Sequence, residues 1–141
     1  MRIGPLVFSC LLFCGLAAAQ TAQTKNISDA HCTITVPADW VSATPGGGSA
    51  HAPDRSMMVM MRGLRREEIP SVVADLKKTK GNVVDDTSSH VLVQAPLSGA
   101  KKQWVQITKT SPFSCRASVS YSTAGKADAA RKIAESVRPR Q

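Results

Sequence analysis

The methionines that follow Met1 all lie in one pentapeptide, Met57-Met58-Val59-Met60-Met61. Thioether sulfur is a ligand that soft cations such as Cu(I) prefer. On a strand the side chains alternate, so Met58 and Met60 share one face and no three methionines converge. His51 lies upstream and could add an imidazole. The residues therefore allow a copper site of Met58, Met60 and His51, but we expect instead a central strand buried on both faces, whose methionines fill gaps in the core.

Catalytic chemistry has little support in the sequence. His51 stands near Asp54 in a glycine-rich stretch, which could in principle orient a general base, but no nucleophile motif such as G-x-S-x-G accompanies the pair. His31, His51 and His90 have no metal-ligand spacing. The run Gly46-Gly47-Gly48-Ser49 lacks the lysine of a P-loop. We therefore expect a protein without catalytic activity and without a bound cofactor.

The charged residues indicate a binding role. The 141-residue chain has 18 Lys and Arg against 10 Asp and Glu, a formal charge of +8. One group of basic residues lies just before and just after a predicted helix: Arg62, Arg65, Arg66, Lys77, Lys78 and Lys80. Such a group could bind a protein partner or an anionic envelope surface, or it could be an ordinary solvated surface. Nucleic acid is disfavoured by the export signal described next and by the few aromatic residues, 4% of the chain.

The amino-terminal residues have the pattern of a secretory signal peptide. Arg2 is followed by an almost wholly apolar run to Leu16, and Ala17-Ala18-Ala19 supplies the small residues that signal peptidase requires. We expect cleavage after residues 1–19 and an exported product, periplasmic or secreted. Beyond Ala19, no apolar stretch is long enough to span a membrane.

Export determines how the cysteines are interpreted. Cys10 and Cys14 leave with the signal peptide, so the product retains Cys32 and Cys115. In an oxidising compartment, two cysteines so far apart predict one structural disulfide. The alternatives are a redox pair, which is usually spaced C-x-x-C, and a metal site, which needs more ligands.

The rest of the pattern predicts a single domain over residues 31–138. Residues 20–30 are polar and aperiodic, which predicts a flexible leader, and residues 139–141 form a short tail. Strands are expected near residues 31–36, 40–41, 56–62, 82–86, 90–95, 102–110 and 113–121. Residues 44–55 hold two prolines and three consecutive glycines, which predicts a long mobile loop.

Two segments carry the apolar stripe of a helix. In the first, Ile69, Val72, Val73 and Leu76 lie on one face and Gly81 follows as a stop. The second covers residues 126–137. The element order β-β-β-α-β-β-β-β-α predicts an α+β fold, an antiparallel sheet of about six to seven strands with two helices packed on it and one disulfide.

The segment Cys32-Thr33-Ile34-Thr35-Val36-Pro37-Ala38-Asp39-Trp40 resembles the strand-Pro-x-x-Trp entry of PsbP/Mog1-like domains. The helix, the four-strand meander and the closing helix that follow are similar to the same fold. The resemblance implies helices on both faces of the sheet and an accessory or protein-binding domain without catalysis. In contrast, Ser114, Arg116, Ser118 and Ser120 alternate with apolar residues, which predicts that one sheet face is partly open to water.

Two functional hypotheses follow from these patterns. The first is an exported, non-catalytic module that binds a protein partner or an anionic surface through its basic residues. The second is a domain that binds a small ligand or a metal, copper in particular, with residues 44–55 and the methionine strand.

Overall fold

The computed structural model describes residues 22–141, so the predicted signal peptide at residues 1–19 lies outside the described part of the chain. The strands of the described part are β1 (Thr24–Ser28), β2 (Cys32–Pro37), β3 (Val41–Ser42), β4 (Ser49–His51), β5 (Met57–Leu64), β6 (Asn82–Asp86), β7 (His90–Pro96), β8 (Lys102–Thr108), β9 (Ser114–Tyr121) and β10 (Arg138–Pro139). The helices are the 3-10 turn η1 (Arg66–Glu68), α1 (Ile69–Lys78), the 3-10 turn η2 (Ala124–Lys126) and α2 (Ala127–Glu135).

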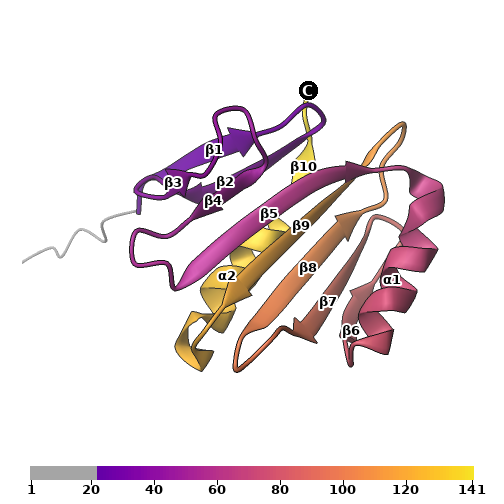
Figure 1. The fold of residues 1–141 in the computed structure, drawn as a ribbon. Helices are drawn as coiled ribbons and strands as arrows, with labels where there is room; N and C mark the ends of the chain where they lie inside the picture. The colour runs from indigo at the N-terminus through magenta and orange to yellow at the C-terminus, as the bar shows by residue number, and fades with distance from the viewer. Residues whose placement is uncertain (1–21) are drawn as a thin grey trace, which may run out of the picture.

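The strands form two antiparallel sheets (Figure 1). The large sheet has seven strands in the order β3-β4-β5-β9-β8-β7-β6, and the small sheet has the order β1-β2-β10. The predicted α+β class is confirmed, with two helices on an antiparallel sheet of seven strands. The three-stranded sheet is an addition that the sequence pattern did not indicate.

Side-chain alternation gives the large sheet two apolar faces, and each is covered differently. On one face, α2 and the small sheet enclose a core that contains Val59, Trp104 and Val119. On the opposite face, α1 packs over the β6–β8 end, where Leu76 joins Val93 in a second core that also contains Leu64 at the end of β5 (Figure 1). The helices therefore lie on opposite faces, as the resemblance implied. The part of the second face over β4, β5 and β9 is exposed, and we call it the open half.

Helix α1 forms where its apolar stripe was predicted. It continues from η1, whose start is capped by a hydrogen bond from the Arg65 N–H to the Glu68 side chain at 2.7 Å. At the other end, the Gly81 N–H donates to the Leu76 carbonyl at 2.8 Å. A Cβ at position 81 would lie 2.4 Å from that oxygen, so glycine is required there.

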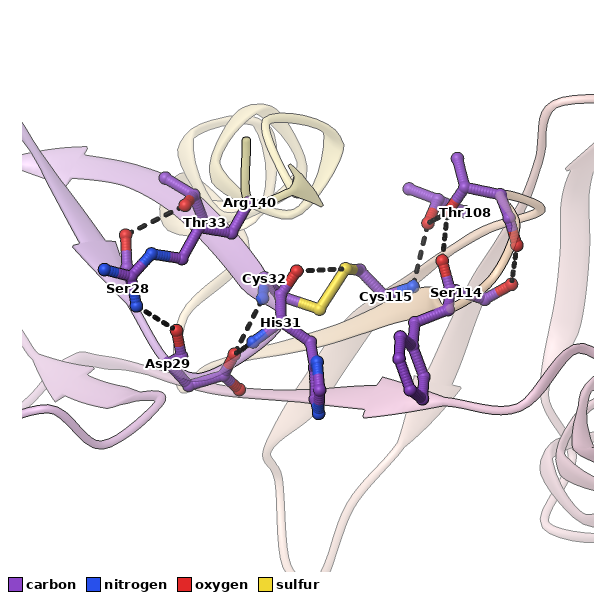
Figure 2. Close-up of a disulfide and its surroundings, with 11 residues drawn as sticks. Ser28, Asp29, His31, Cys32, Thr33, Thr108, Ser114, Cys115 and Arg140 are labelled. Carbon is purple, nitrogen blue, oxygen red and sulfur yellow. Dashed lines mark hydrogen bonds between the residues drawn. A yellow bond between two sulfur atoms is a disulfide. The ribbon is translucent and has the colours of Figure 1, made fainter.

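Cys32 of β2 and Cys115 of β9 form the predicted disulfide, which joins the small sheet to the large one. Both cysteines are fully buried. The Asp29 carboxylate accepts hydrogen bonds from the N–H groups of His31 and Cys32, at 2.8 and 2.7 Å (Figure 2). On the other side, the Thr108 hydroxyl accepts from the Cys115 N–H at 2.8 Å. These hydrogen bonds hold both ends of the bridge in place.

The predicted flexible leader is wrong for Thr24–Ser28. These residues form β1 and pair with β2 along its length, from Thr24 opposite Pro37 to Ser28 opposite Thr33. Only Ile27 is buried, so the strand is held by its backbone ladder, which leaves no apolar pattern in the sequence. The predicted tail is likewise wrong at Pro139, which pairs with Cys32 in the small sheet.

The prediction of a mobile loop at residues 44–55 is wrong for Ser49–His51, which form strand β4. Ser49–His51 pairs with β5, and the Met61 N–H donates to the Gly48 carbonyl at 2.7 Å. A Cβ at position 48 would lie 2.3 Å from the Met61 carbonyl oxygen. The close approach of the two backbones explains why position 48 is a glycine. The strand itself could not be predicted, because three residues are too few to show the alternation of a strand.

Within residues 22–141, no helix has both the length and the apolar character needed to cross a membrane.

Loss of the disulfide should destabilise the fold strongly. Replacing both Cys32 and Cys115 by alanine opens a loop of 83 residues in the unfolded chain, which costs about 4–5 kcal/mol in the chain-entropy description. Urea unfolding followed by tryptophan fluorescence measures the change. The reduced native protein is the control, because its core volume is unchanged. A double variant as stable as the oxidised native protein would contradict this role.

Gly48→Ala should destabilise the protein by roughly 1–3 kcal/mol, because the new methyl group must push β4 away from β5. The matched control is Gly125→Ala, since a Cβ at position 125 meets no atom within 4 Å. Thermal unfolding of the two variants gives the comparison. If Gly48→Ala unfolds at the same temperature as the control, β4 is not held against β5 as described.

Candidate functional site

The register of β4, β5 and β9 places eight side chains on the open half. Met58 lies between His51 and Ser120, Met60 lies between Ser49 and Ser118, and Arg62 is opposite Arg116. Each belongs to the set of alternate residues whose side chains point away from α2, whereas the side chains of the intervening residues point to the core under α2. The face partly open to water that the sequence predicted is therefore present, except at Ser114, which is fully buried.

The methionine strand is not buried on both faces, so that expectation is wrong. Met57 and Met61 are buried under the small sheet and α2, but Met58 is 44% exposed and Met60 is 61% exposed. The reason is the position of α1, which covers the β6–β8 end of the sheet and Leu64 at the end of β5, but leaves Met58 and Met60 uncovered. Two large flexible apolar side chains therefore lie at the protein surface, next to each other on one face.

Arg62 and Arg116 form a pair of like charges at directly opposed positions of the β5–β9 ladder. Partial burial, and then the nearby Arg62 charge, lower the pKa of Arg116. Among the described residues, neither guanidinium takes part in a salt bridge or a side-chain hydrogen bond. Like charges opposite each other destabilise a sheet, so this pair is an unneutralised positive site that the fold retains at a cost.

A hollow lies beside the arginine pair. Its lining combines Met60 and Leu97 with the polar side chains of Gln103, Arg116 and Ser118. Leu97 belongs to the β7–β8 turn and is exposed. The hollow thus offers apolar contact, hydrogen-bond donors and two cationic groups in one place. It suits a carboxylate on a short aliphatic stem, such as the side chain of Glu or Asp.

The six basic residues that the sequence singled out have different surroundings in the structure. Arg62 lies on the open half, whereas Arg66 and Lys77 line a groove between α1 and β7 together with Lys109. Lys109 donates to the Asp86 carboxylate at 2.7 Å, and this bond lowers the pKa of Asp86. Of the others, Lys78 contacts Asp75 at 3.5 Å, Lys80 has a φ of 63° in the turn after α1, and Arg65 precedes η1.

The groove beside α1 is therefore partly neutralised, and the open half is not. Sequence reasoning missed Arg116, because it grouped basic residues by their distance along the chain. The available signal was its place between Ser114 and Ser118 in an alternating strand, which put it on the face of Arg62.

A Ser-His-Asp chain of hydrogen bonds lies in the β6–β7 hairpin. His90 Nε2 is 2.9 Å from the Asp85 carboxylate, and His90 Nδ1 is 3.1 Å from the Ser89 hydroxyl. The Ser89 hydroxyl is also 3.0 Å from the Thr87 hydroxyl. Such a chain can activate a serine only beside an oxyanion hole and a substrate cleft. Here it lies at an exposed turn, where these bonds organise the hairpin.

Clusters of the hard and borderline ligands that commonly bind metal ions are absent from residues 22–141. No cluster of three or more His, Cys, Asp and Glu side chains is found there. The remaining soft ligands are Met58 and Met60, with His51 across the strand from Met58.

Solved structures resemble this chain in fold. No protein-family description matches the sequence, and no curated protein matches it either. A crystal structure from Bacteroides thetaiotaomicron VPI-5482 aligns with a TM-score of 0.57 at 18% identity, over 86% of this chain and 50% of that one. The chain thus spans half the length of that protein. CyanoP, the cyanobacterial PsbP of Synechocystis sp. PCC 6803, aligns with a TM-score of 0.50 at 9% identity, over 87% of this chain and 96% of that one.

The fold of this chain is therefore PsbP-like, which confirms the resemblance drawn from the Pro-x-x-Trp segment and the order of elements. At these identities the likeness concerns the fold alone.

Replacing one member of the arginine pair should stabilise the protein. Arg62→Glu turns the repulsion with Arg116 into attraction, so the free energy of unfolding should rise by about 0.2–1 kcal/mol. Arg62→Gln, which removes the repulsion only, should gain less. Both gains should shrink at high salt. Urea unfolding at low and high ionic strength measures them, and a Glu variant less stable than the Gln variant would show that the two side chains do not interact.

Proposed function

We propose that this protein is an exported, non-catalytic binding module that holds an acidic protein partner on the open half of its large sheet. The observation that carries the proposal is the unneutralised pair of Arg62 and Arg116 beside two exposed methionines on one sheet face. Arginine and methionine are enriched at protein interfaces. An arginine whose charge is unpaired in the free protein can gain a carboxylate from a partner.

The shape of the open half supports a macromolecular partner. The large sheet has seven strands and presents a broad face (Figure 1), and the hollow at Arg116 is lined by Met60, Leu97 and Ser118. A partner surface can cover Met58 and Met60 while one of its carboxylates enters the hollow. Apolar contact would then supply affinity and the charge pair would supply orientation.

Export is supported by two independent features. The amino-terminal residues predict a signal peptide, and the fold contains a buried disulfide between its two sheets, which is compatible with an oxidising compartment. The partner would accordingly be a protein of the same exported compartment.

An anionic surface is the other binding target that the sequence allowed, and the structure gives it less support. Binding to a charged lipid or polymer surface uses many dispersed cations. Here the groove beside α1 already contains Asp86, paired with Lys109. The pair of Arg62 and Arg116 instead lies next to exposed apolar side chains, and among the described residues neither guanidinium is in a salt bridge.

Retention from an envelope extract of the source organism tests the proposal. Protein purified after expression of the full chain is immobilised in three forms: native, Arg62→Glu and Lys77→Glu. The last two have the same change in net charge. We expect the native protein and Lys77→Glu to retain the same acidic protein, and Arg62→Glu to lose it by tenfold or more.

Vesicles that contain anionic lipid provide the contrasting measurement. Equal loss of vesicle binding by Arg62→Glu and Lys77→Glu, with no protein retained from the extract, would mean that overall charge is the property used. That result would overturn the proposal of a specific partner site.

A further inference from the structure

The open half carries a second group of residues with a different chemistry. His51 of β4 and Met58 of β5 are directly opposed in the ladder, and Met60 lies two residues farther along the same face. Opposed residues have Cβ atoms about 4.5–5.5 Å apart, and residues i and i+2 of a strand are separated by roughly 7 Å. One imidazole and two thioethers therefore lie within reach of a common point.

A backbone carbonyl orients the imidazole of His51. Its Nδ1 is 2.8 Å from the Ala52 carbonyl oxygen. A carbonyl only accepts hydrogen bonds, so Nδ1 carries a hydrogen, and in the neutral ring the lone pair is on Nε2. Metal-binding histidines are commonly oriented by such a bond from the second ring nitrogen.

The two methionines are able to turn toward His51. Met58 lines the same surface hollow as His51, together with Ser120 and Tyr121. Met60 lines the neighbouring hollow, and its three side-chain torsions allow the sulfur to swing toward Met58. Both side chains are exposed, so this rotation disturbs no core packing.

We propose that His51, Met58 and Met60 bind one soft monovalent cation, Cu(I) or its analogue Ag(I). Two thioether sulfurs and one imidazole nitrogen form a neutral, soft, three-coordinate ligand set. Hard cations need oxygen ligands, and Zn²⁺ prefers thiolate, imidazole and carboxylate in combination. The described residues hold no cluster of that kind.

The charges around the hollow add selectivity. Arg55 and Lys101 line it with His51 and Met58. Their repulsion acts on any cation, but a divalent ion experiences twice the Coulomb energy of a monovalent one at the same distance. The site therefore discriminates against Cu²⁺ and Zn²⁺ by charge as well as by ligand type.

This inference goes beyond the proposed docking function and does not depend on it. The two proposals share Met58 and Met60, but the metal site adds His51 as a ligand, whereas the carboxylate site is centred on Arg62 and Arg116. The metal alone is the probe, and no partner is needed for the measurement.

Titration with silver nitrate in chloride-free buffer, followed by the methionine methyl signals in NMR, tests the site. We expect the methyl signals of Met58 and Met60 and the ring signals of His51 to shift together and to saturate at one equivalent. Met57 and Met61 are internal controls, because they belong to the same strand but are buried on its opposite face. Their signals should stay in place.

Variants complete the test. Met58→Leu and Met60→Leu should each weaken Ag(I) binding at least tenfold, and Met57→Leu should leave it unchanged. Zn²⁺ should cause no saturating shift. Cu(I) binding is measured by competition with a chromogenic chelator under reducing conditions. It should also be weaker in Met58→Leu and Met60→Leu and unchanged in Met57→Leu. Absence of methyl shifts, equal shifts at all four positions, or native affinity in Met58→Leu would overturn the proposal.

Discussion

The ladder between β5 and β9 determines what this protein presents to its surroundings. It runs for eight residue pairs, from Met57 opposite Tyr121 to Leu64 opposite Ser114. Because side chains alternate along a strand, a slip of one residue would exchange the buried and the exposed sets. The observed register is fixed by burial, since Val59, Ala117 and Val119 are fully buried under α2 and the small sheet. The same register necessarily turns Met58, Met60, Arg62 and Arg116 outward.

The two helices determine how much of the outward set remains accessible. Helix α2 and the small sheet complete the core on one face, and the disulfide ties that sheet to β9. Helix α1 follows β5 and precedes β6, so it packs over the far end of the sheet. Had it crossed β5 and β9 instead, the arginine pair would have been covered. The functional proposals therefore rest on incomplete coverage of one face, which follows from topology and not from a sequence motif.

The fold could be predicted from the sequence to a large extent. The stripe of Ile69, Val72 and Leu76 and the alternation of β9 are strong periodic signals, and Cys32 with Cys115 allowed one structural pairing. What could not be predicted depends on contacts between distant segments. Strands β1 and β4 are short and mostly polar, and they exist because a longer strand offers a backbone ladder.

The candidate site was harder to predict for a related reason. Arg62 and Arg116 are far apart along the chain, so the sequence does not show that they are directly opposite each other in the β5–β9 ladder. The group of six basic residues was assembled from sequence proximity; in the structure Arg66 and Lys77 line one groove, and Arg62 lies on the open half. Met58, Met60 and His51 were named as a set, but their place on an uncovered face depends on where α1 packs. A periodic pattern fixes the side of a strand that each residue occupies, and it does not say what covers that side.

The central claim is that Arg62 and Arg116 form one unneutralised site for a carboxylate. It is tested most directly by following the arginine Nε–Hε signals in NMR while a short acidic peptide is added, with a neutral peptide of the same length as the control. Arg131 is the internal reference, because its guanidinium already pairs with Glu135 at 2.9 Å. The account predicts that Arg62 and Arg116 shift together with the acidic peptide while Arg131 does not. Equal shifts at all three arginines, or none at the pair, would contradict it.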